Sequence, residues 1–373
     1  MKRRLFLHLT TAAAALAALT ACGGGGGGAS TTAEASGAPA AAAAAAASTT
    51  AAAAAAAPAA ALAAPTPTAN PAPSAPQIAI SNQPDVWLQT GWDSAAYWIQ
   101  GETWGAGNLT SGTYTGLNGS QFEQQIGVSN QMGPNGEVAA RMAWKWPTGT
   151  TEIKSFPALL VGNKPGFFNT SANPGGLPVR LLDGTNSQVT PSGKTPGSFF
   201  PLQLPIDSLK SSFAYKHNAA PTGHGHLSYD IWLQETPEQV NGFLASPITH
   251  EIMIPLTNWG GYGDHITGRN AGWYDHDVTI DGKLFHVYVN KGADGAVRAD
   301  FYGGWKFIVF QPDQPIEAGT LDLAKFINYV ATRKDALGTP WATGREYAVS
   351  AELGVEPHDG TGDLTLYNYR VWK

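Results

Sequence analysis

The sequence has a single cysteine, Cys22, among its 373 residues, so the rest of the chain has no thiol and forms no disulfide. Charged residues are scarce as well, at 13%. Beyond residue 77 the chain carries 19 basic and 27 acidic residues, because three of the 22 basic and one of the 28 acidic residues lie before that point. This acidic balance disfavours nucleic acid and anionic lipid as partners of the later part. Phosphate-binding loops, Gly-x-Ser-x-Gly elbows and dinucleotide fingerprints are absent too.

Residues 1–22 have the pattern of an export signal. A basic start is followed by an Ala/Leu core that is too short to span a membrane. The stretch Leu19-Thr20-Ala21-Cys22 resembles the lipobox of bacterial lipoproteins, and the run RRLFL near the start also resembles a twin-arginine signal. The resemblance implies that Cys22 is lipidated and holds the protein in the bacterial cell envelope, at the outer membrane or cell surface. The alternative is an ordinary cleavage site and a secreted protein.

A long segment of low complexity follows, from residue 23 to residue 77. It consists almost throughout of Gly, Ala, Pro, Ser and Thr, with one charged residue, Glu34. Too little large apolar surface is available to offset the entropy lost on folding, so we expect a disordered linker. Residues 78–373 are numerous enough to bury a full core. We expect them to form one domain and a monomer, attached to the membrane only through Cys22.

The 78–373 segment has the pattern of short strands separated by clusters of Gly, Asn, Pro, Ser and Thr. One stretch, 321–333, instead has apolar residues at helical spacing, and Asp281-Gly282 marks a hairpin turn. An all-β sandwich of two antiparallel sheets with one surface helix is the simplest interpretation. The Gly- and Pro-rich stretch 162–199 is expected to form long loops along a cleft. The expected strands are 120–128, 138–146, 228–234, 251–256, 277–280, 284–290, 305–310 and 347–353.

Two of the expected strands carry glutamates in apolar surroundings. In the first, Glu251 and Met253 point to one face of the strand. In the other, Glu352 and Glu356 share a face, and Pro357 is expected to end the pairing just beyond them. Burial of a carboxylate without a partner is costly, so either these are edge residues in water or the strands face each other across a cleft. Glycoside hydrolysis requires the second arrangement, with one carboxylate as nucleophile or base and one as general acid.

Two short segments group potential metal ligands, namely His224-Gly225-His226 and Asp275-His276-Asp277. Neither has the spaced partners that are characteristic of zinc or calcium sites. We therefore expect loop residues in solvent at both places, and neither a metal ion nor another cofactor.

Five segments in the same order resemble glycoside hydrolase family 12. They are Trp144-Lys145-Trp146, Lys154-Ser155-Phe156-Pro157, Tyr229-Asp230-Ile231-Trp232-Leu233, Glu251-Ile252-Met253-Ile254 and Gly354-Val355-Glu356-Pro357. The resemblance extends from about Gly101 to the C-terminus. It implies a β-jelly roll with a concave substrate cleft, and the activity of an endo-β-1,4-glucanase or xyloglucanase on a β-glucan polysaccharide.

The match to the family also implies catalytic roles. Glu251 corresponds to the family's nucleophile, Glu356 to its acid/base, and Asp230 to an aspartate beside the nucleophile. The family retains the anomeric configuration, which requires carboxyl groups roughly 5–5.5 Å apart. At such a separation the charge of Glu251 is expected to raise the pKa of Glu356. The alternative for Asp230 is an ordinary strand aspartate that bonds to a neighbouring loop.

Residues 101–105 resemble the motif that begins the family's cleft, so Trp104 is expected to stack on a glucose ring; a core aromatic is the alternative. Glu102 stands where the family usually has asparagine. Beside the glutamates, Pro255 replaces a common tryptophan and His358 replaces an aromatic residue. The substrate-binding residues expected from the resemblance are Glu102, Trp104, Trp144, Trp232 and Met253.

Two further functions stay open at this level, a non-catalytic glucan-binding jelly roll and a structural envelope lipoprotein. The paired glutamates argue against the first, and the aromatic residues of the expected cleft argue against the second. The sequence does not distinguish cellulose, mixed-linkage glucan and xyloglucan, since tolerance of branches depends on the width of the cleft.

Overall fold

The computed structural model describes residues 78–81, 87–89, 97–106, 110–111, 121–129, 133–147, 153–162, 179–181, 199–238, 247–263, 272–299 and 304–373. All of them belong to one compact unit, Ala69–Lys373. The expected signal peptide, the linker and Cys22 lie outside the described residues, so the expectations for them stay predictions.

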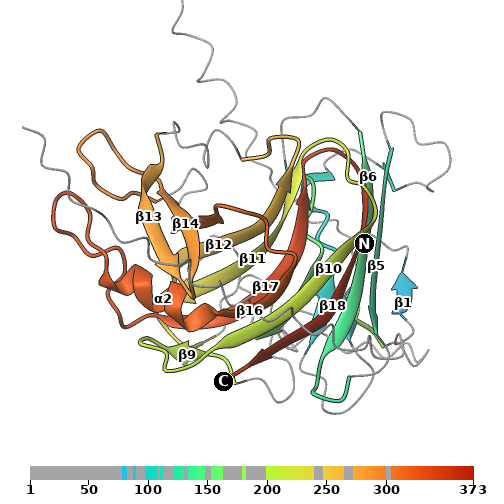
Figure 1. Ribbon diagram of the computed structural model, residues 1–373, viewed down its shortest axis with the longest axis horizontal. Helices are drawn as coiled ribbons and strands as arrows, with labels where there is room; N and C mark the ends of the chain where they lie inside the picture. Colours follow the sequence, from blue (N-terminus) through green and yellow to red (C-terminus); the bar gives the residue numbers. More distant parts are fainter. Residues whose placement is uncertain are drawn as a thin grey trace, which may run out of the picture. The chain divides into compact units, whose positions relative to one another are not determined.

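The described residues form two β-sheets (Figure 1). The seven-stranded sheet has the order β1 (Ile78–Ser81), β5 (Gln121–Ser129), β6 (Val138–Trp146), β18 (Gly360–Trp372), β10 (Lys210–Ala219) and β16 (Ala318–Asp322), with β4 (Thr110–Ser111) paired to β5. The eleven-stranded sheet has the order β13 (Tyr274–Ile280), β14 (Lys283–Val289), β15 (Lys306–Pro312), β12 (Ile248–Trp259), β11 (Gly225–Gln234), β17 (Tyr347–Pro357), β7 (Ala158–Gly162), β3 (Trp98–Gln100), β2 (Trp87–Gln89) and β8 (Val179–Leu181), with β9 (Leu202–Gln203) paired to β17.

Side chains of the eleven-stranded sheet alternate between two faces, as the period of a strand requires. On β11 the odd-numbered residues, from Leu227 to Leu233, join the main core, to which Leu364 and Leu366 of the seven-stranded sheet also belong. The even-numbered residues of β11 therefore point to the opposite face. In Figure 1 the long strands of both sheets bend together, and the eleven-stranded sheet lies on the inner side of the bend. We call the face turned away from the core the concave face.

One α-helix, α2 (Leu323–Thr332), follows β16 directly. Its buried Phe326 packs edge-on against Phe285 of β14 and Phe310 of β15, with ring centroids 5.0 and 5.2 Å apart. The helix thus covers part of the core, because its apolar residues recur at helical spacing on one side. Among the described residues, no helix has both the length and the apolar character needed to cross a membrane.

The fold confirms the expected all-β jelly roll, with one α-helix among the residues that the structure describes. The turn at Asp281-Gly282 joins β13 to β14 with both residues at positive φ, 52° and 73°, as a two-residue hairpin requires. Strand β17 ends at Pro357, as expected. The direction of some strands differs from the expected antiparallel sheets, since β15 pairs with β12, β8 with β2 and β4 with β5 in parallel. Most of the expected loop region 162–199 lies outside the described residues, and its described part includes β8.

Candidate active site

Three neighbouring strands carry the predicted catalytic residues on the concave face. Strand β11 lies between β12 and β17 and pairs with both in antiparallel fashion. Trp232 lies opposite Glu251 on β12, and Asp230 lies opposite Met253 on β12 and Glu352 on β17. Because alternate residues share a face, this register brings Glu251, Asp230 and Glu352 to the same side of the sheet. It is the side turned away from the main core.

Glu251 is held by a tryptophan that directly precedes the parallel neighbour strand β15. The Nε1–H group of Trp305 donates a hydrogen bond of 2.7 Å to Oε2 of Glu251. The Trp305 ring itself is fixed, since it is buried and packs edge-on against Trp232 with centroids 5.3 Å apart. Glu251 is partly exposed. Its carboxylate is therefore oriented from one side and accessible from another.

Glu356 is buried and surrounded by donor groups. The Tyr262 hydroxyl donates a hydrogen bond of 2.5 Å to Oε1, and Nε2 of His226 lies 3.4 Å from Oε2. Burial by itself raises the pKa of Glu356, but the charge and hydrogen bonding of His226, the Tyr262 hydroxyl and the charge of His358 together outweigh it and hold the pKa below its ordinary value. The expectation of a raised pKa was therefore wrong for this structure. The register explains why, because His226 lies directly opposite Glu356.

The two glutamates lie on the strands that flank β11, beside opposite ends of β11. Glu251 faces Trp232, whereas Glu356 faces His226, six residues earlier on β11. Six residues of strand correspond to roughly 20 Å at ~3.3 Å per residue. On a flat sheet the two carboxyl groups would stand too far apart to act on one bond. Figure 1 shows that these strands bend with the concave face on the inner side, where side chains lie closer together than on a flat sheet.

Between the two glutamates lies a buried set of polar residues. Glu352 accepts hydrogen bonds from Oγ of Ser350 at 3.1 Å and from Nε2 of Gln100 at 3.3 Å. The same Gln100 amide donates to Glu102 at 3.0 Å. Glu352 is completely buried and Asp230 is 4% exposed, whereas Glu251 is partly exposed. These buried hydrogen bonds therefore link β3, β17 and the loop of Glu102.

The segment 153–157 ties the loop of Glu102 to the end of β17. The backbone N–H of Lys154 donates to the Pro357 carbonyl at 3.0 Å, and the N–H of Phe156 donates to the Glu102 carbonyl at 3.1 Å. These bonds fix the backbone of both segments. Glu102 itself has a φ of 42°, a left-handed conformation that asparagine adopts more readily than glutamate.

The structure corrects one predicted substrate-binding residue, Trp144. This residue belongs to β6 of the seven-stranded sheet and is 0% exposed in the main core. Its ring stacks on Trp259 with centroids 5.4 Å apart and covers Gly362, where an added Cβ would lie 2.1 Å from the ring. A sugar cannot reach Trp144, because side chains from both sheets enclose it. Trp144 is therefore a core residue and not a substrate-binding residue.

The other predicted binding residues have different positions. Trp232 and Met253 lie on the concave face but are only 2% and 4% exposed, because neighbouring aromatic side chains cover them. Glu102 is buried beside Gln100. Trp104 begins the short 3₁₀ helix η1 (Trp104–Ala106), and its side chain lies outside what the structure describes.

Sequence reasoning missed the groups that orient the two glutamates. Trp305 is brought to Glu251 by the parallel pairing of β15 with β12, which local patterns do not specify. Tyr262 reaches Glu356 from the turn after β12. His226 was noted only as a potential metal ligand, although alternation on β11 already placed it on the face of Asp230.

The two residues that depart from the family pattern also have clear positions. Pro255 lies opposite Ser228, directly beside an irregularity in the β11–β12 pairing, where a residue without an N–H is tolerated. His358 follows β17, and its ring lies 5.7 Å from the Tyr262 ring.

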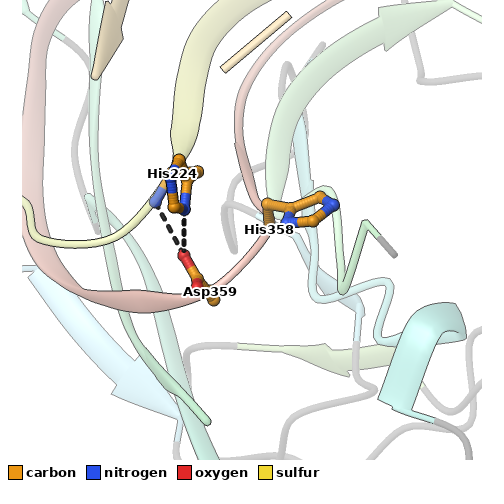
Figure 2. A group of neighbouring side chains, drawn as sticks. All are labelled: His224, His358 and Asp359. Atoms are coloured by element: carbon orange, nitrogen blue, oxygen red, sulfur yellow. Dashed lines mark hydrogen bonds and ion pairs between the residues drawn. The ribbon is translucent and has the colours of Figure 1, made fainter. Parts of the chain in front are cut away.

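Two segments were expected to hold loop residues in solvent. His224 is exposed outside the strands as expected, whereas His226 is buried on β11 and residues 275–277 lie on β13. His224 precedes β11, and its Nδ1 lies 2.8 Å from Oδ1 of Asp359, with His358 close to both (Figure 2). The partners of His224 come from a turn more than 130 residues later in the chain, so short-range spacing in the sequence did not reveal them.

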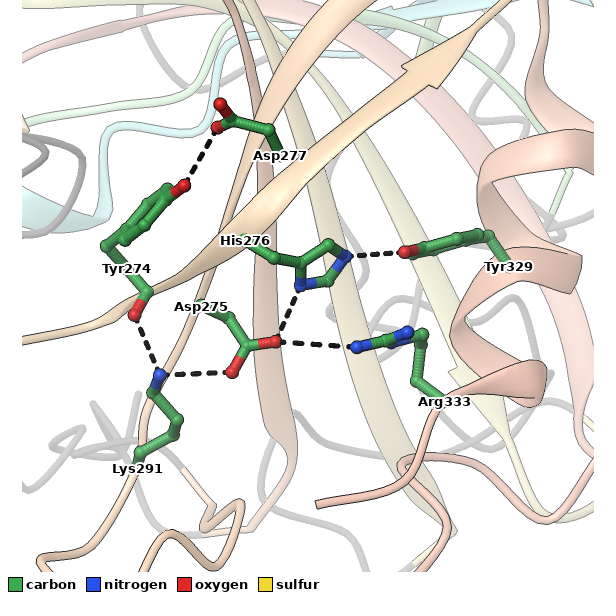
Figure 3. A network of polar contacts seen from close by, with 7 residues as sticks. All are labelled: Tyr274, Asp275, His276, Asp277, Lys291, Tyr329 and Arg333. Carbon is green, nitrogen blue, oxygen red and sulfur yellow. Dashed lines mark hydrogen bonds and ion pairs between the residues drawn. The ribbon is translucent and has the colours of Figure 1, made fainter. Parts of the chain in front are cut away.

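The second cluster lies on β13 and joins the hairpin β13–β14 to α2 (Figure 3). Asp275 contacts His276 at 2.6 Å, Lys291 at 3.0 Å and Arg333 at 3.8 Å. His276 in turn lies 2.5 Å from the Tyr329 hydroxyl of α2. The hydrogen bond from His276, aided by Lys291, lowers the pKa of Asp275 to about 2. This cluster is an ion-pair network rather than a set of solvated loop residues.

Replacement of Asp275 by asparagine is expected to destabilise the fold. The folded-state pKa of about 2 lies below the ordinary value of 3.8, so the anionic form stabilises the protein by about 2 kcal/mol near pH 7. This contribution is fully present above about pH 4 and is lost as the pH falls through 2. The free energies of unfolding of D275N and wild type, measured with urea, should therefore differ at pH 7 and become equal in acid. The control D294N removes an exposed pair with Arg298 and should leave stability nearly unchanged.

Comparisons with known proteins agree with this geometry. The family model described as glycosyl hydrolase family 12 matches residues 170–372. Endoglucanase S of Pectobacterium parmentieri is 26% identical over 240 residues, which cover 64% of this chain and 72% of that protein. A family 12 xyloglucanase from Bacillus licheniformis has a TM-score of 0.55 at 24% identity, covering 79% of this chain and 99% of the other. Endoglucanase Cel12A from Rhodothermus marinus has a TM-score of 0.51 at 17% identity, covering 79% and 97%. The chain belongs to glycosyl hydrolase family 12 and is a glycoside hydrolase of this endoglucanase and xyloglucanase family.

Proposed function

We propose that the protein is an endo-acting, retaining hydrolase of β-1,4-glucan chains, with Glu251 as nucleophile and Glu356 as acid/base. The observation that carries this proposal is the placement of both glutamates on one concave face, on strands that flank β11. Each glutamate has its own orienting donor, Trp305 for Glu251 and Tyr262 for Glu356.

In the first step the protonated form of Glu356 gives its proton to the glycosidic oxygen while Glu251 attacks the anomeric carbon. Because the surroundings of Glu356 hold its pKa low, this form is the minor one near neutral pH. The leaving chain departs as an alcohol, and the sugar stays bound as an ester of Glu251. In the second step Glu356 removes a proton from water, whose oxygen displaces Glu251 from the anomeric carbon. Two inversions at one carbon retain the configuration. This mechanism requires the carboxyl groups roughly 5–5.5 Å apart, so it also requires that the bend of the sheet bring them much closer than they would lie on a flat sheet.

Asp230 has a supporting role in this proposal. It lies diagonally across from Glu251, on the neighbouring strand and on the same face. Asp230 would therefore act on the nucleophile from the neighbouring strand.

The substrate class is tested by reducing-sugar release from carboxymethylcellulose, mixed-linkage glucan and xyloglucan in parallel. An endo-acting enzyme should lower the viscosity of at least one of these polymers well before it releases much reducing sugar. Proton NMR during the first turnovers should show the β-anomer of the product. Release of the α-anomer first would contradict a retaining mechanism, and binding without any turnover would indicate a glucan-binding protein.

Cys22 is proposed as a lipid anchor that holds the hydrolase on the cell envelope through the linker. Replacement of Cys22 by serine should move the protein from the membrane fraction to the soluble fraction of the native host, since a thioether to lipid cannot form. Mass spectrometry of the mature wild-type protein should show an acylated N-terminal cysteine. An unmodified Cys22 in that protein would contradict the anchor.

A further inference from the structure

We propose that His224, His358 and Asp359 form a binding site for a divalent transition-metal ion. Each residue offers one ligand atom, and the three atoms lie within 4.8 Å of one another. His224 precedes β11, whereas the other two residues form the turn between β17 and β18 (Figure 2). Two imidazoles and one carboxylate from separate segments therefore converge at one edge of the fold. The three residues are called the His-His-Asp site below.

The backbone around the His-His-Asp site is already fixed. The N–H of His358 donates to the His224 carbonyl at 2.9 Å, and the N–H of His224 donates to Oδ1 of Asp359 at 2.8 Å. Because the backbone of both segments is held in place before the ion arrives, only side chains need to be ordered on binding.

Glycines allow the two segments to approach this closely. Gly223 and Gly360 have φ values of +70° and +82°. A Cβ on Gly223 would lie 2.4 Å from Oδ1 of Asp359, and a Cβ on Gly360 would lie 2.1 Å from the Thr222 carbonyl. Only glycine fits either position, because both the conformation and the space exclude a side chain. The close packing thus specifies the distance between the ligand-bearing segments.

The ligand chemistry favours zinc, nickel or copper. Imidazole nitrogen and carboxylate oxygen bind Zn²⁺ at roughly 2.0–2.2 Å, so ligand atoms in a tetrahedral site lie roughly 3.3 Å apart. Nδ1 of His224 and Oδ1 of Asp359 are 2.8 Å apart, the distance of a hydrogen bond whose proton lies on Nδ1 in the donating tautomer. An ion would replace that proton after a small outward shift, for which the His224 ring has room because its side chain is 50% exposed. Mg²⁺ and Ca²⁺ prefer sites made of oxygen ligands.

Binding would fasten the turn after Glu356-Pro357 to the start of β11. The turn follows β17, and His224 directly precedes β11. Backbone hydrogen bonds from the N–H groups of His358 and Asp359 to the His224 carbonyl already join them. An ion shared between them would add a cross-link that the unfolded chain lacks, and would raise the melting temperature. The test of this proposal does not depend on the catalytic roles above, because it measures neither glucan binding nor turnover.

The test is isothermal titration of ZnCl₂ into the full-length chain, purified without a polyhistidine tag and dialysed against a chelator. We expect one site per chain, and MgCl₂ should give no heat of binding. D359N keeps the acceptor for the His224 N–H but loses the anionic ligand, so its affinity for Zn²⁺ should fall at least tenfold. H224A should have the same effect and should also abolish the rise in melting temperature. Co²⁺ should give the visible absorption of a tetrahedral site with nitrogen ligands.

The matched control is H276Q, which replaces a histidine of β13 outside the site. Its Zn²⁺ affinity should equal that of the wild type. Zinc binding that is unchanged in both D359N and H224A would overturn the proposal, as would the absence of saturable binding by the wild type. Loss of binding in H276Q but not in D359N would place the ion at β13 and would overturn it as well. Circular dichroism of each variant establishes that it is folded before titration.

Discussion

Replacement of Glu251 by glutamine is expected to abolish turnover on every glucan while leaving binding measurable. The amide has nearly the shape of the carboxylate, and its oxygen can still accept the hydrogen bond from Trp305 that is 2.7 Å long in the wild type. It cannot form the ester with the anomeric carbon, because a neutral amide is a poor nucleophile. Loss of a nucleophile lowers kcat by roughly 10⁴-fold or more.

The measurement is kcat on the best of the three polymers, together with the dissociation constant for an oligosaccharide of the same linkage. A folded E251Q protein with unchanged affinity and no turnover would support the nucleophile role. Retention of more than about a tenth of wild-type activity would place the nucleophile elsewhere. The control E317Q alters an exposed glutamate away from the concave face and should keep full activity.

The alternation of side chains was enough to predict which residues share a face. Glu251 with Met253, and Glu352 with Glu356, follow from the period of a strand, and the structure places both pairs on the concave side as that period requires. The hairpin at Asp281-Gly282 was predictable for a similar reason, since its two residues specify the turn locally. These features depend on neighbours in the sequence.

Features that depend on the order of strands could not be predicted. His226 reaches Glu356 because β11 lies beside β17, and Trp305 reaches Glu251 because β15 joins β12 in parallel. Neither pairing has a local signal. The pKa of Glu356 was misjudged as a result, because the expectation included only the negative charge of Glu251. The charges of His226 and His358 and the hydrogen bonds from His226 and Tyr262 decide the direction in which the pKa of Glu356 shifts.

The case of Trp144 shows how a motif can mislead when the sheet is unknown. Its residues alternate like those of any strand, and aromatic residues suit both a sugar platform and a core. The seven-stranded sheet contributes its inward side chains to the core alone, so Trp144 is enclosed. Assigning β6 to that sheet would have required the pairing of β6 with β5 and β18.

A Glu356→Ala variant is expected to separate the acid role from the base role. Natural glucans have leaving groups that need a proton, so kcat should fall by about 10²–10⁴-fold, the typical contribution of a general acid. An aryl glycoside with a good leaving group needs no proton, and its glycosyl-enzyme should form at a rate close to that of the wild type. The intermediate should then accumulate, since no carboxylate remains to activate water.

Azide should rescue the accumulated intermediate of this variant. The azide anion attacks the anomeric carbon, the bond to the Glu251 oxygen breaks, and the carboxylate of Glu251 is regenerated without any proton transfer. Two displacements at one carbon give a β-glycosyl azide, which NMR identifies. The alanine also removes the acceptor of Tyr262 and the partner of His226, so a parallel E356Q variant keeps the shape of the side chain as a control for folding.

If azide neither accelerates a folded variant nor yields the β-azide, Glu356 is not the acid/base. Glu352, four residues earlier on the same face, would then be the next residue to replace, although its complete burial and its bonds to Gln100 and Ser350 favour a structural role.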